Sequence, residues 1–409
     1  MKTQIIFLFL LIVHCSSWSQ NGMPTDGPCT NDMLLKVKGK WIKSSDLGES
    51  NSPNYKAQQQ EAYKRLDEIH NMVLKIYPQP IAVDAVWHRS IGLSYFGTGR
   101  KYYTNRDDVL TFDYSNLPSF TRYYYRCGFF AYYCGNGNFM WPGHTNETGT
   151  WLTITTNSIE GCVGDLAGND TWTINGLPVR TRNPVLKKIW NDYELQHSEP
   201  GSNGRYVLIH RKGLLPYLPV TRKQYLDYCL VYTAQLHDKM IEGVKQIPVR
   251  SLEEQEKEKK ARLAKYEKDF GSDPKRAKSA IDYYLSGYQT DQQRRDEQVK
   301  VQIKNKEDVL KHYQDELEKT TKEGLLDSPA IVRLFHSPDA QTPVFAKETE
   351  GGSMLVTENP AYLKKDLPKY VPQFMVFFWS WSSNPPEKKL GEIVEANFPI
   401  ERLQAMIDK

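Results

Sequence analysis

The residues best suited to contact a ligand lie in a loop that combines aromatic, titratable and amide side chains. This loop, residues 139–146, offers Trp141, His144 and Asn146 as candidate contacts. An aromatic ring beside a few polar groups is typical of sites that stack on a sugar ring or a peptide. The competing and favoured interpretation is structural, with Trp141 filling the edge of the core.

Two further indoles, Trp379 and Trp381, are separated by a single residue within an apolar stretch. Side chains two residues apart lie on the same face of a strand, so this pair would form an aromatic strip suited to binding. Core packing is again the favoured interpretation.

Four cations, Arg211, Lys212, Arg222 and Lys223, bracket a proline-containing stretch. Arg222 and Lys223 fall in the first turn of a predicted helix, where the backbone carries partial positive charge. A helix N-terminus beside four cations attracts anions. This hypothesis predicts that substitution of Arg222 and Lys223 weakens the binding of an anionic ligand.

Motifs with a diagnostic catalytic spacing are missing from the sequence. It has no His-Glu-x-x-His pair and no Cys-x-x-Cys pair, so neither a metal site nor a cofactor is expected. His88, His144 and His210 carry side chains that titrate near neutral pH, but no partner carboxylate or nucleophile is in view for them. These three histidines are the candidate acids or bases if the protein is a hydrolase.

The cysteines predict two disulfides and one free thiol. Disulfides form in oxidising compartments, and five cysteines follow the predicted export signal. We predict that Cys127 pairs with Cys134 across a tight loop and that Cys29 pairs with Cys162. Cys229 lies on the apolar face of a predicted helix, where a buried, inert thiol is usual.

Residues 1–20 are typical of a signal peptide. Lys2 is followed by an apolar run from Ile5 to Val13, and small residues precede the expected cleavage site. An uncleaved anchor is disfavoured because this run is well short of the roughly 20 residues that span a bilayer. A lipid-modified Cys15 is the minor alternative, since His14 stands where a small residue is expected. The mature chain is therefore predicted to be periplasmic or extracellular, without a membrane span.

Helical periodicity and caps locate three parts of the chain. Residues 54–76 carry apolar side chains at helical spacing, and Thr221 with Gln224 forms a capping box at the start of a second helix. Between Arg250 and Glu323, 18 basic and 17 acidic residues sum to +1, which is typical of solvated helices with ion pairs. We expect two or three helices there, with a break before Pro274.

Alternating apolar residues predict strands over 81–212, the first of them near Val83–Tyr95. Arg89 interrupts the inward-facing set of this strand, and a bulge is favoured over a buried guanidinium with a partner. The aromatic stretch 120–134 predicts a hairpin that turns at Cys127-Gly128 or closes at residues 135–137. Residues 184–195 are predicted as a short helix, and 370–381 as a central strand apolar on both faces.

The sequence thus predicts an α+β protein. We expect a signal peptide (1–20), a flexible arm (21–53), a β-rich α+β domain with a capped core helix (54–248), a charged helical segment (249–325), and a C-terminal segment (326–409) that packs on the body and completes its sheet. The helical segment is either an insertion or a separate domain.

The leading functional prediction is non-catalytic binding of a glycan, a peptide or another protein outside the cytoplasm. A hydrolase acting on glycan or peptide is the alternative, and an enzyme is disfavoured. With a net charge of only +4 and no concentrated basic footprint, a nucleic-acid partner is not expected.

Overall fold

The computed structural model divides the chain into two compact units. The described residues are 29–46, 53–93, 101–102, 112–113, 120–140, 149–159, 161–164, 172–174, 177–190, 193–197, 203–333 and 342–409. One unit, here called the body, comprises the residues up to Pro219 together with Ser353–Lys409. The other, here called the helical unit, comprises Val220–Gly352. Helices and a large mixed sheet are both present, which confirms the predicted α+β class.

The body is built on an eight-stranded sheet, ordered β1-β2-β5-β8-β18-β14-β13-β12. Its strands are β1 (Trp41–Lys43), β2 (Val83–Leu93), β5 (Thr121–Ala131), β8 (Trp151–Thr156), β18 (Met375–Ser380), β14 (Arg205–Ile209), β13 (Tyr193–His197) and β12 (Val185–Trp190). β1 runs parallel to β2, and the other neighbours are antiparallel. β18 lies between β8 and β14, so the C-terminal segment completes this sheet, as predicted.

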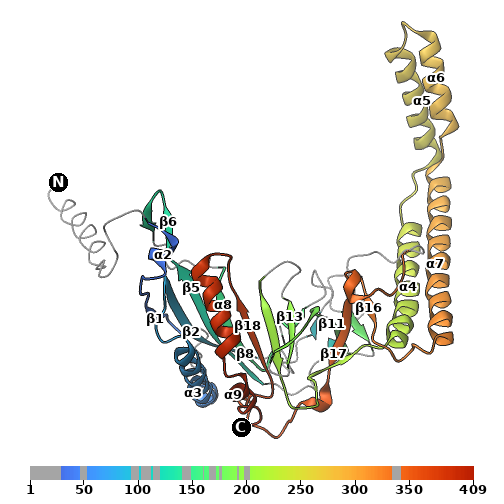
Figure 1. Ribbon diagram of the computed structural model, residues 1–409. Coiled ribbons are helices and arrows are strands. Elements are labelled where there is room, and N and C mark those ends of the chain that lie inside the picture. Colours follow the sequence, from blue (N-terminus) through green and yellow to red (C-terminus); the bar gives the residue numbers. More distant parts are fainter. Residues whose placement is uncertain are drawn as a thin grey trace. The chain divides into compact units, whose positions relative to one another are not determined.

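Three helices cover one face of this sheet: α3 (Pro53–Ile76), α8 (Pro385–Asn397) and α9 (Ile400–Gln404). The α3 side chains Ala62, Leu66 and Ile69 are fully buried against inward residues of the strands, because the helical and strand periods each bring apolar residues to one side. Figure 1 shows α3 and α8 beside the strands of the body.

A smaller sheet packs on part of the opposite face. It joins β10 (Trp172–Ile174), β11 (Leu177–Arg182), β17 (Ser353–Glu358) and β15 (Tyr217–Pro219) in that order, with β9 (Val163–Gly164) beside β11. Its Val356 and Tyr217 share a buried cluster with Leu208 and Val376 of the large sheet. β18 is therefore covered on both faces, which confirms the prediction from its two-sided apolar pattern.

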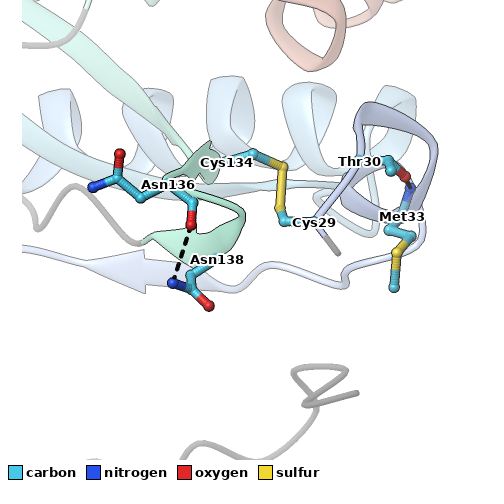
Figure 2. The surroundings of a disulfide bond; sticks show 6 residues. All are labelled: Cys29, Thr30, Met33, Cys134, Asn136 and Asn138. Carbon is cyan, nitrogen blue, oxygen red and sulfur yellow. Dashed lines mark hydrogen bonds between the residues drawn. A yellow bond between two sulfur atoms is a disulfide. The ribbon is translucent and has the colours of Figure 1, made fainter. Parts of the chain in front are cut away.

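The N-terminal part of the described chain is tied to a hairpin. Strands β6 (Tyr133–Gly135) and β7 (Asn138–Met140) turn at Asn136-Gly137, where both residues have positive φ, as a two-residue type I′ turn requires. A disulfide joins Cys134 of this hairpin to Cys29, just before helix α2 (Asn31–Leu34), whose cap is Thr30 (Figure 2).

The predicted disulfide pairs were therefore wrong. β5 continues four residues beyond Cys127 in one direction, about 13 Å of extended chain, whereas a disulfide needs Cα atoms within ~7 Å. Cys127 and Cys162 are buried free thiols in two different apolar clusters. Cys229 is also free and buried, as predicted.

Arg89 remains in register on β2, and the predicted bulge was wrong. Every residue of β2 pairs in sequence with β5. The Arg89 guanidinium instead has partners: its Nε lies 3.1 Å from Asp46 Oδ1, and its Nη1 lies 3.0 Å from Asp67 Oδ2. It also stacks 4.0 Å from the Tyr63 ring centroid. Two carboxylates and the face of an aromatic ring thus compensate the positive charge of Arg89, which the alternation of side chains along β2 places on the inward side of the strand.

The helical unit is a hairpin of two long helices with two shorter helices between them in sequence. α4 (Arg222–Lys245) and α7 (Asp291–Lys322) pack antiparallel. Arg295 Nη1, near the start of α7, donates to the Lys245 carbonyl at the end of α4, whereas Lys306, later in α7, pairs with Asp238, earlier in α4. Between them the chain forms α5 (Leu252–Asp269) and α6 (Pro274–Ser286). The capping box of Thr221 and Gln224 is present, as predicted.

Other predictions also need correction. Residues 185–190 and 193–197 form strands β12 and β13 instead of a helix, because they pair with each other and with β14. The predicted turn at Cys127-Gly128 is wrong, because β5 runs through it, while the alternative closure at 135–137 is confirmed. Trp41–Lys43 of the predicted arm is a strand of the sheet. The capped helix belongs to the helical unit and not to the β-rich body.

No described helix is both long and apolar enough to cross a membrane.

Candidate binding site

The site is formed by α5, α6 and the first turn of α7, at one end of the hairpin of the helical unit (Figure 1). Each of these helices begins at a side-chain cap. Ser251 and Glu254 form a capping box for α5, Asp273 caps α6, and Thr290 and Gln293 form a capping box for α7. These caps fix where each helix starts and therefore which side chains face one another.

A hollow of about 490 Å³ lies among these helices. Its α5 wall uses positions 255, 258, 259 and 262, which share one helical face. Four cations line it, Arg250, Lys259, Arg262 and Arg294, against one carboxylate, Glu258. Lys259 Nζ also lies 3.7 Å from Glu256, a carboxylate outside the lining, so the hollow carries only a modest excess of positive charge.

Two of the cations are held in a clasp around Asp291. Arg250 donates from Nε and Nη2 to the two carboxylate oxygens of Asp291, at 2.7 and 3.0 Å, and Arg294 donates to the same group at 2.8 Å. The hydrogen bonds from Arg250 lower the pKa of Asp291 below its ordinary value of 3.8. These hydrogen bonds hold Arg250 and Arg294 in place, and the Asp291 carboxylate neutralises part of their positive charge.

A buried glutamine ties α5 to the start of α7. The Gln255 side chain is 4% exposed. Its Nε2 donates to the Arg250 carbonyl and its Oε1 accepts from the Asp291 amide, both at 2.7 Å. Both ends of the amide are satisfied, so this side chain sets the distance between the two helix termini.

Aromatic rings help to join α5 to α6. The Tyr266 ring lies 5.9 Å from that of Tyr284, which in turn lies 5.7 Å from that of Tyr288. Lys259 Nζ lies 4.7 Å from the Tyr288 centroid, and the Arg262 guanidinium lies 5.7 Å from that of Tyr284. The cations thus rest on the faces of the rings that form the wall.

Arg262 is the cation best placed to receive a ligand. Its Nε donates to the Tyr266 hydroxyl at 3.4 Å, and it forms no ion pair with any described residue. The hydrogen bond to Tyr266 raises the pKa of Arg262 above its ordinary value, so the guanidinium group stays positively charged. Its remaining N–H donors can serve a carboxylate, sulfate or phosphate group.

The hollow is suited to binding and offers little for catalysis. It is lined by no histidine or cysteine, and its only carboxylate, Glu258, is paired with Arg250. Among the described residues, no group of three His, Cys, Asp or Glu side chains could hold a metal ion. What the lining does offer is positive charge, aromatic faces and amide groups.

The sites predicted from the sequence are not brought together here. Trp141, His144 and Asn146 lie outside the described residues. Trp379 is only 2% exposed and stacks on Phe377 at 4.9 Å, so it packs in the core. Trp381 is half-buried beside the same core, with the Arg205 guanidinium 5.4 Å from its ring centroid.

Three of the four cations predicted to bind an anion contact other residues of the chain. Arg211 donates to both carboxylate oxygens of Asp408, at 2.7 and 2.6 Å, and is 15% exposed, whereas Lys212 is exposed. The Arg222 guanidinium lies 4.6 Å from the Phe345 ring centroid, and Lys223 pairs with Asp227 at 2.5 Å.

The backbone at the start of α4 is occupied as well. The first two amides of the helix donate to the carbonyls of Ser328 and Leu326, and the third donates to the Thr221 hydroxyl. With these N–H groups already bonded to protein atoms, this helix end offers an anion no free backbone donor.

The histidines considered for catalysis that the structure describes lie apart. His210 Nδ1 lies 2.8 Å from the Arg211 carbonyl oxygen, so a backbone group satisfies it. His88 is half-buried near Tyr124, and burial together with the charge of Arg126 lowers the pKa of its ring. Neither contacts a carboxylate or a nucleophile within the part of the chain that the structure describes.

The charged segment was predicted to be helical, but no site was predicted in it. The signal was present: Tyr284 and Tyr288 are four residues apart, as are Gln255 and Lys259, and capping-box pairs begin α5 and α7. What the sequence could not reveal is that α5 and α6 face each other.

Comparisons of the chain with protein-family models, with curated proteins and with solved structures found no match, so its function must be argued from its own residues.

Proposed function

We propose that this is an exported, non-catalytic binding protein that holds an anionic ligand in the hollow between α5 and α6. One observation carries the proposal: four cations and one carboxylate line this hollow, and one of these cations, Arg262, forms no ion pair with a described residue. Aromatic faces and amides beside the cations supply contact area and orientation, as in other ligand sites.

Two features support export to the periplasm or the extracellular space. The first residues are typical of a signal peptide. The Cys29–Cys134 disulfide would persist in an oxidising compartment and would be reduced in most cytosols.

The hydrolase alternative has no specific support among the described residues. A hydrolytic site needs a general base or nucleophile within reach of the scissile bond. The lining of the hollow offers neither, whereas the charge of its cations would directly stabilise a bound anion. Binding therefore explains this arrangement better than catalysis.

Titration calorimetry of the full mature chain would test the proposal. The probes are an oligogalacturonate, a sulfated oligosaccharide, polyphosphate and hexaglutamate, with a neutral oligosaccharide for comparison. The double variant Lys259→Ala, Arg262→Ala should weaken binding of the best anion by about tenfold or more, equivalent to roughly 1.4 kcal/mol.

A matched control lies on the opposite face of the same helix. Lys257 and Lys260 are exposed and line no part of the hollow. The variant Lys257→Ala, Lys260→Ala removes the same charge and should change affinity less than about twofold, because surface charges are screened over short distances. Equal losses in the two variants, or no binding of any anion, would contradict the proposal.

A further inference from the structure

A second hollow shares part of its lining with the first. This second hollow, about 550 Å³, is open and lies along α6. Its lining includes Lys275, Lys278, Ser279, Asp282 and Ser286, whose spacing places them on one face of the helix, so two cations stand beside one carboxylate. Tyr283 and Ser286 line both hollows.

Tyr283 is the most exposed large hydrophobic side chain among the described residues. It is 83% exposed, and its ring contacts no other ring among the described residues. Each neighbouring tyrosine, Tyr284 and Tyr288, by contrast packs against another ring or a cation. An aromatic ring left open to water between two hollows is suited to stacking on a ligand.

Unpaired cations stand on both sides of this ring. Arg262 faces the first hollow, and Lys275 and Lys278 line the second; none of the three forms an ion pair with a described residue. The face from position 275 to 286 is about 16 Å long at the rise of an α-helix. A ligand that meets all three cations must therefore be extended and carry repeated negative charges.

The lining does not resemble a groove for a helical peptide. It holds no Leu, Ile, Val, Met or Phe, whereas an amphipathic helix lays its apolar face into a hydrophobic groove. An extended peptide also needs free backbone partners, as at a sheet edge. The backbone of α5 and α6 is bonded within the helices.

A chain of sugar rings fits these features better. A pyranose ring has a C–H face that can lie on an aromatic ring, and a rim of hydroxyl groups that hydrogen-bond to amides, hydroxyls and charged groups. Ser279, Ser286 and Gln289 supply such groups around Tyr283. Carboxylate or sulfate groups on the sugars would meet the cations.

We propose that the ligand is an acidic glycan, with one sugar ring stacked on Tyr283 and its acidic groups held by Arg262 on one side and by Lys275 and Lys278 on the other. This inference rests on the proposed function and narrows its ligand class from anions in general to acidic sugars.

The test measures binding to the full mature chain by calorimetry with three probes: an oligogalacturonate, a neutral galacto-oligosaccharide of equal length, and hexaglutamate. The oligogalacturonate should bind at least tenfold more tightly than either of the others. Comparable binding of hexaglutamate would overturn the glycan proposal while leaving the anion site intact, and comparable binding of the neutral sugar would overturn the role of the acidic groups.

Two substitutions at one position isolate the stacking ring. Tyr283→Ala should weaken oligogalacturonate binding by tenfold or more, while Tyr283→Phe, which keeps the ring, should stay within twofold of the parent. Because this side chain is exposed, both variants should fold. Unchanged binding in Tyr283→Ala, with binding lost in the Lys259→Ala, Arg262→Ala variant, would overturn stacking while upholding the anion site.

The second hollow has its own test. The variant Lys275→Ala, Lys278→Ala should weaken a long oligogalacturonate more than a disaccharide, because only the longer chain reaches that face. An equal effect on both lengths would show that the ligand does not extend past Tyr283 and would overturn the two-hollow proposal.

Discussion

The side chain of His70 on α3 packs among three aromatic side chains of the body. Its ring stacks on Trp87 with centroids 3.7 Å apart, meets the edge of Trp41 at 5.4 Å, and places Nδ1 3.1 Å from the Tyr125 hydroxyl. Burial lowers the pKa of this histidine from 6.5 to about 4, although nearby Asp67 acts in the opposite direction. The ring is therefore neutral when the protein is folded at neutral pH.

This environment predicts an acid-dependent loss of stability. Because the pKa of His70 is lower in the folded than in the unfolded state, its stabilising contribution is complete above pH 6.5 and is lost as the pH falls toward 4. After a discount for partial exposure, we expect the free energy of unfolding to fall by about 1 to 2 kcal/mol over this range. Urea unfolding followed by tryptophan fluorescence measures it.

The variant His70→Gln provides the control for that pH dependence. It removes the titrating ring and should flatten most of the slope between pH 6.5 and 4, although His88, whose pKa is also lowered, still contributes in the same direction. Loss at lower pH should persist, since Arg89 and Arg211 outweigh burial and hold the pKa values of Asp46 and Asp408 below 3.8. An unchanged slope would show that His70 does not titrate as proposed.

The environment of a single residue was predictable where it depends on neighbours in the sequence. The inward side of β2 followed from alternation alone, and Val83 and Ala85 are fully buried. The partners of Arg89 were not predictable, because Asp46 and Asp67 lie 43 and 22 residues away along the chain. The sequence showed only that a charge interrupts the inward-facing set, and on that basis a bulge was favoured.

At the scale of elements, α5 and α6 depend on few buried contacts. Gln255 is the only buried residue of α5, and Ala277 is the only buried residue of α6. Helices with so little buried apolar surface belong to the least stable part of a fold. The two hydrogen bonds that Gln255 makes with the Arg250 carbonyl and the Asp291 amide should therefore contribute a large part of the stability of α5 and α6.

We expect Gln255→Ala to loosen the tip of the hairpin. The substitution leaves a backbone carbonyl and an amide without their partner, at a cost of roughly 1 to 3 kcal/mol. Hydrogen exchange should accelerate in α5 and α6 while the strands of the body keep their protection. Gln298→Ala, at an exposed position of α7, serves as the matched control and should change nothing. Equal exchange in the two variants would contradict a structural role for Gln255.

Elements defined by local signals were predicted, and those defined by distant pairing were not. Thr221 and Gln224 form their capping box within four residues, so the start of α4 was legible in the sequence. Residues 185–190 have apolar spacing that also suits a helix, and only pairing with β13 makes them a strand. The Cys29–Cys134 disulfide spans 105 residues and follows from the position of the β6–β7 hairpin, which spacing alone does not give.

At the scale of the whole molecule, the helical unit is an insertion between two neighbouring strands of the body. The chain leaves the body at Pro219, at the end of β15, and returns at Ser353, at the start of β17. These strands are antiparallel partners, with Pro219 opposite Val356. The two ends of the body at the insertion point are therefore close enough for a short connection.

The sequence provides a way to observe the body separately. All nine tryptophans lie outside residues 220–352. Tryptophan fluorescence therefore reports on the body, whereas much of the helical circular dichroism comes from α4 to α7.

This topology predicts that the body folds without the helical unit. Replacement of Val220–Gly352 by a flexible Gly/Ser linker of about six residues should bridge the antiparallel strands without strain. The shortened chain should keep a cooperative urea transition in tryptophan fluorescence, with a free energy of unfolding within about 1 kcal/mol of the parent, because its main apolar cluster lies wholly within the body. It should retain the Cys29–Cys134 disulfide and lose all binding of the acidic oligosaccharide. A shortened chain that unfolds without cooperativity would show that the body depends on the insertion for its stability, and one that still binds the oligosaccharide would move the ligand site away from α5 and α6.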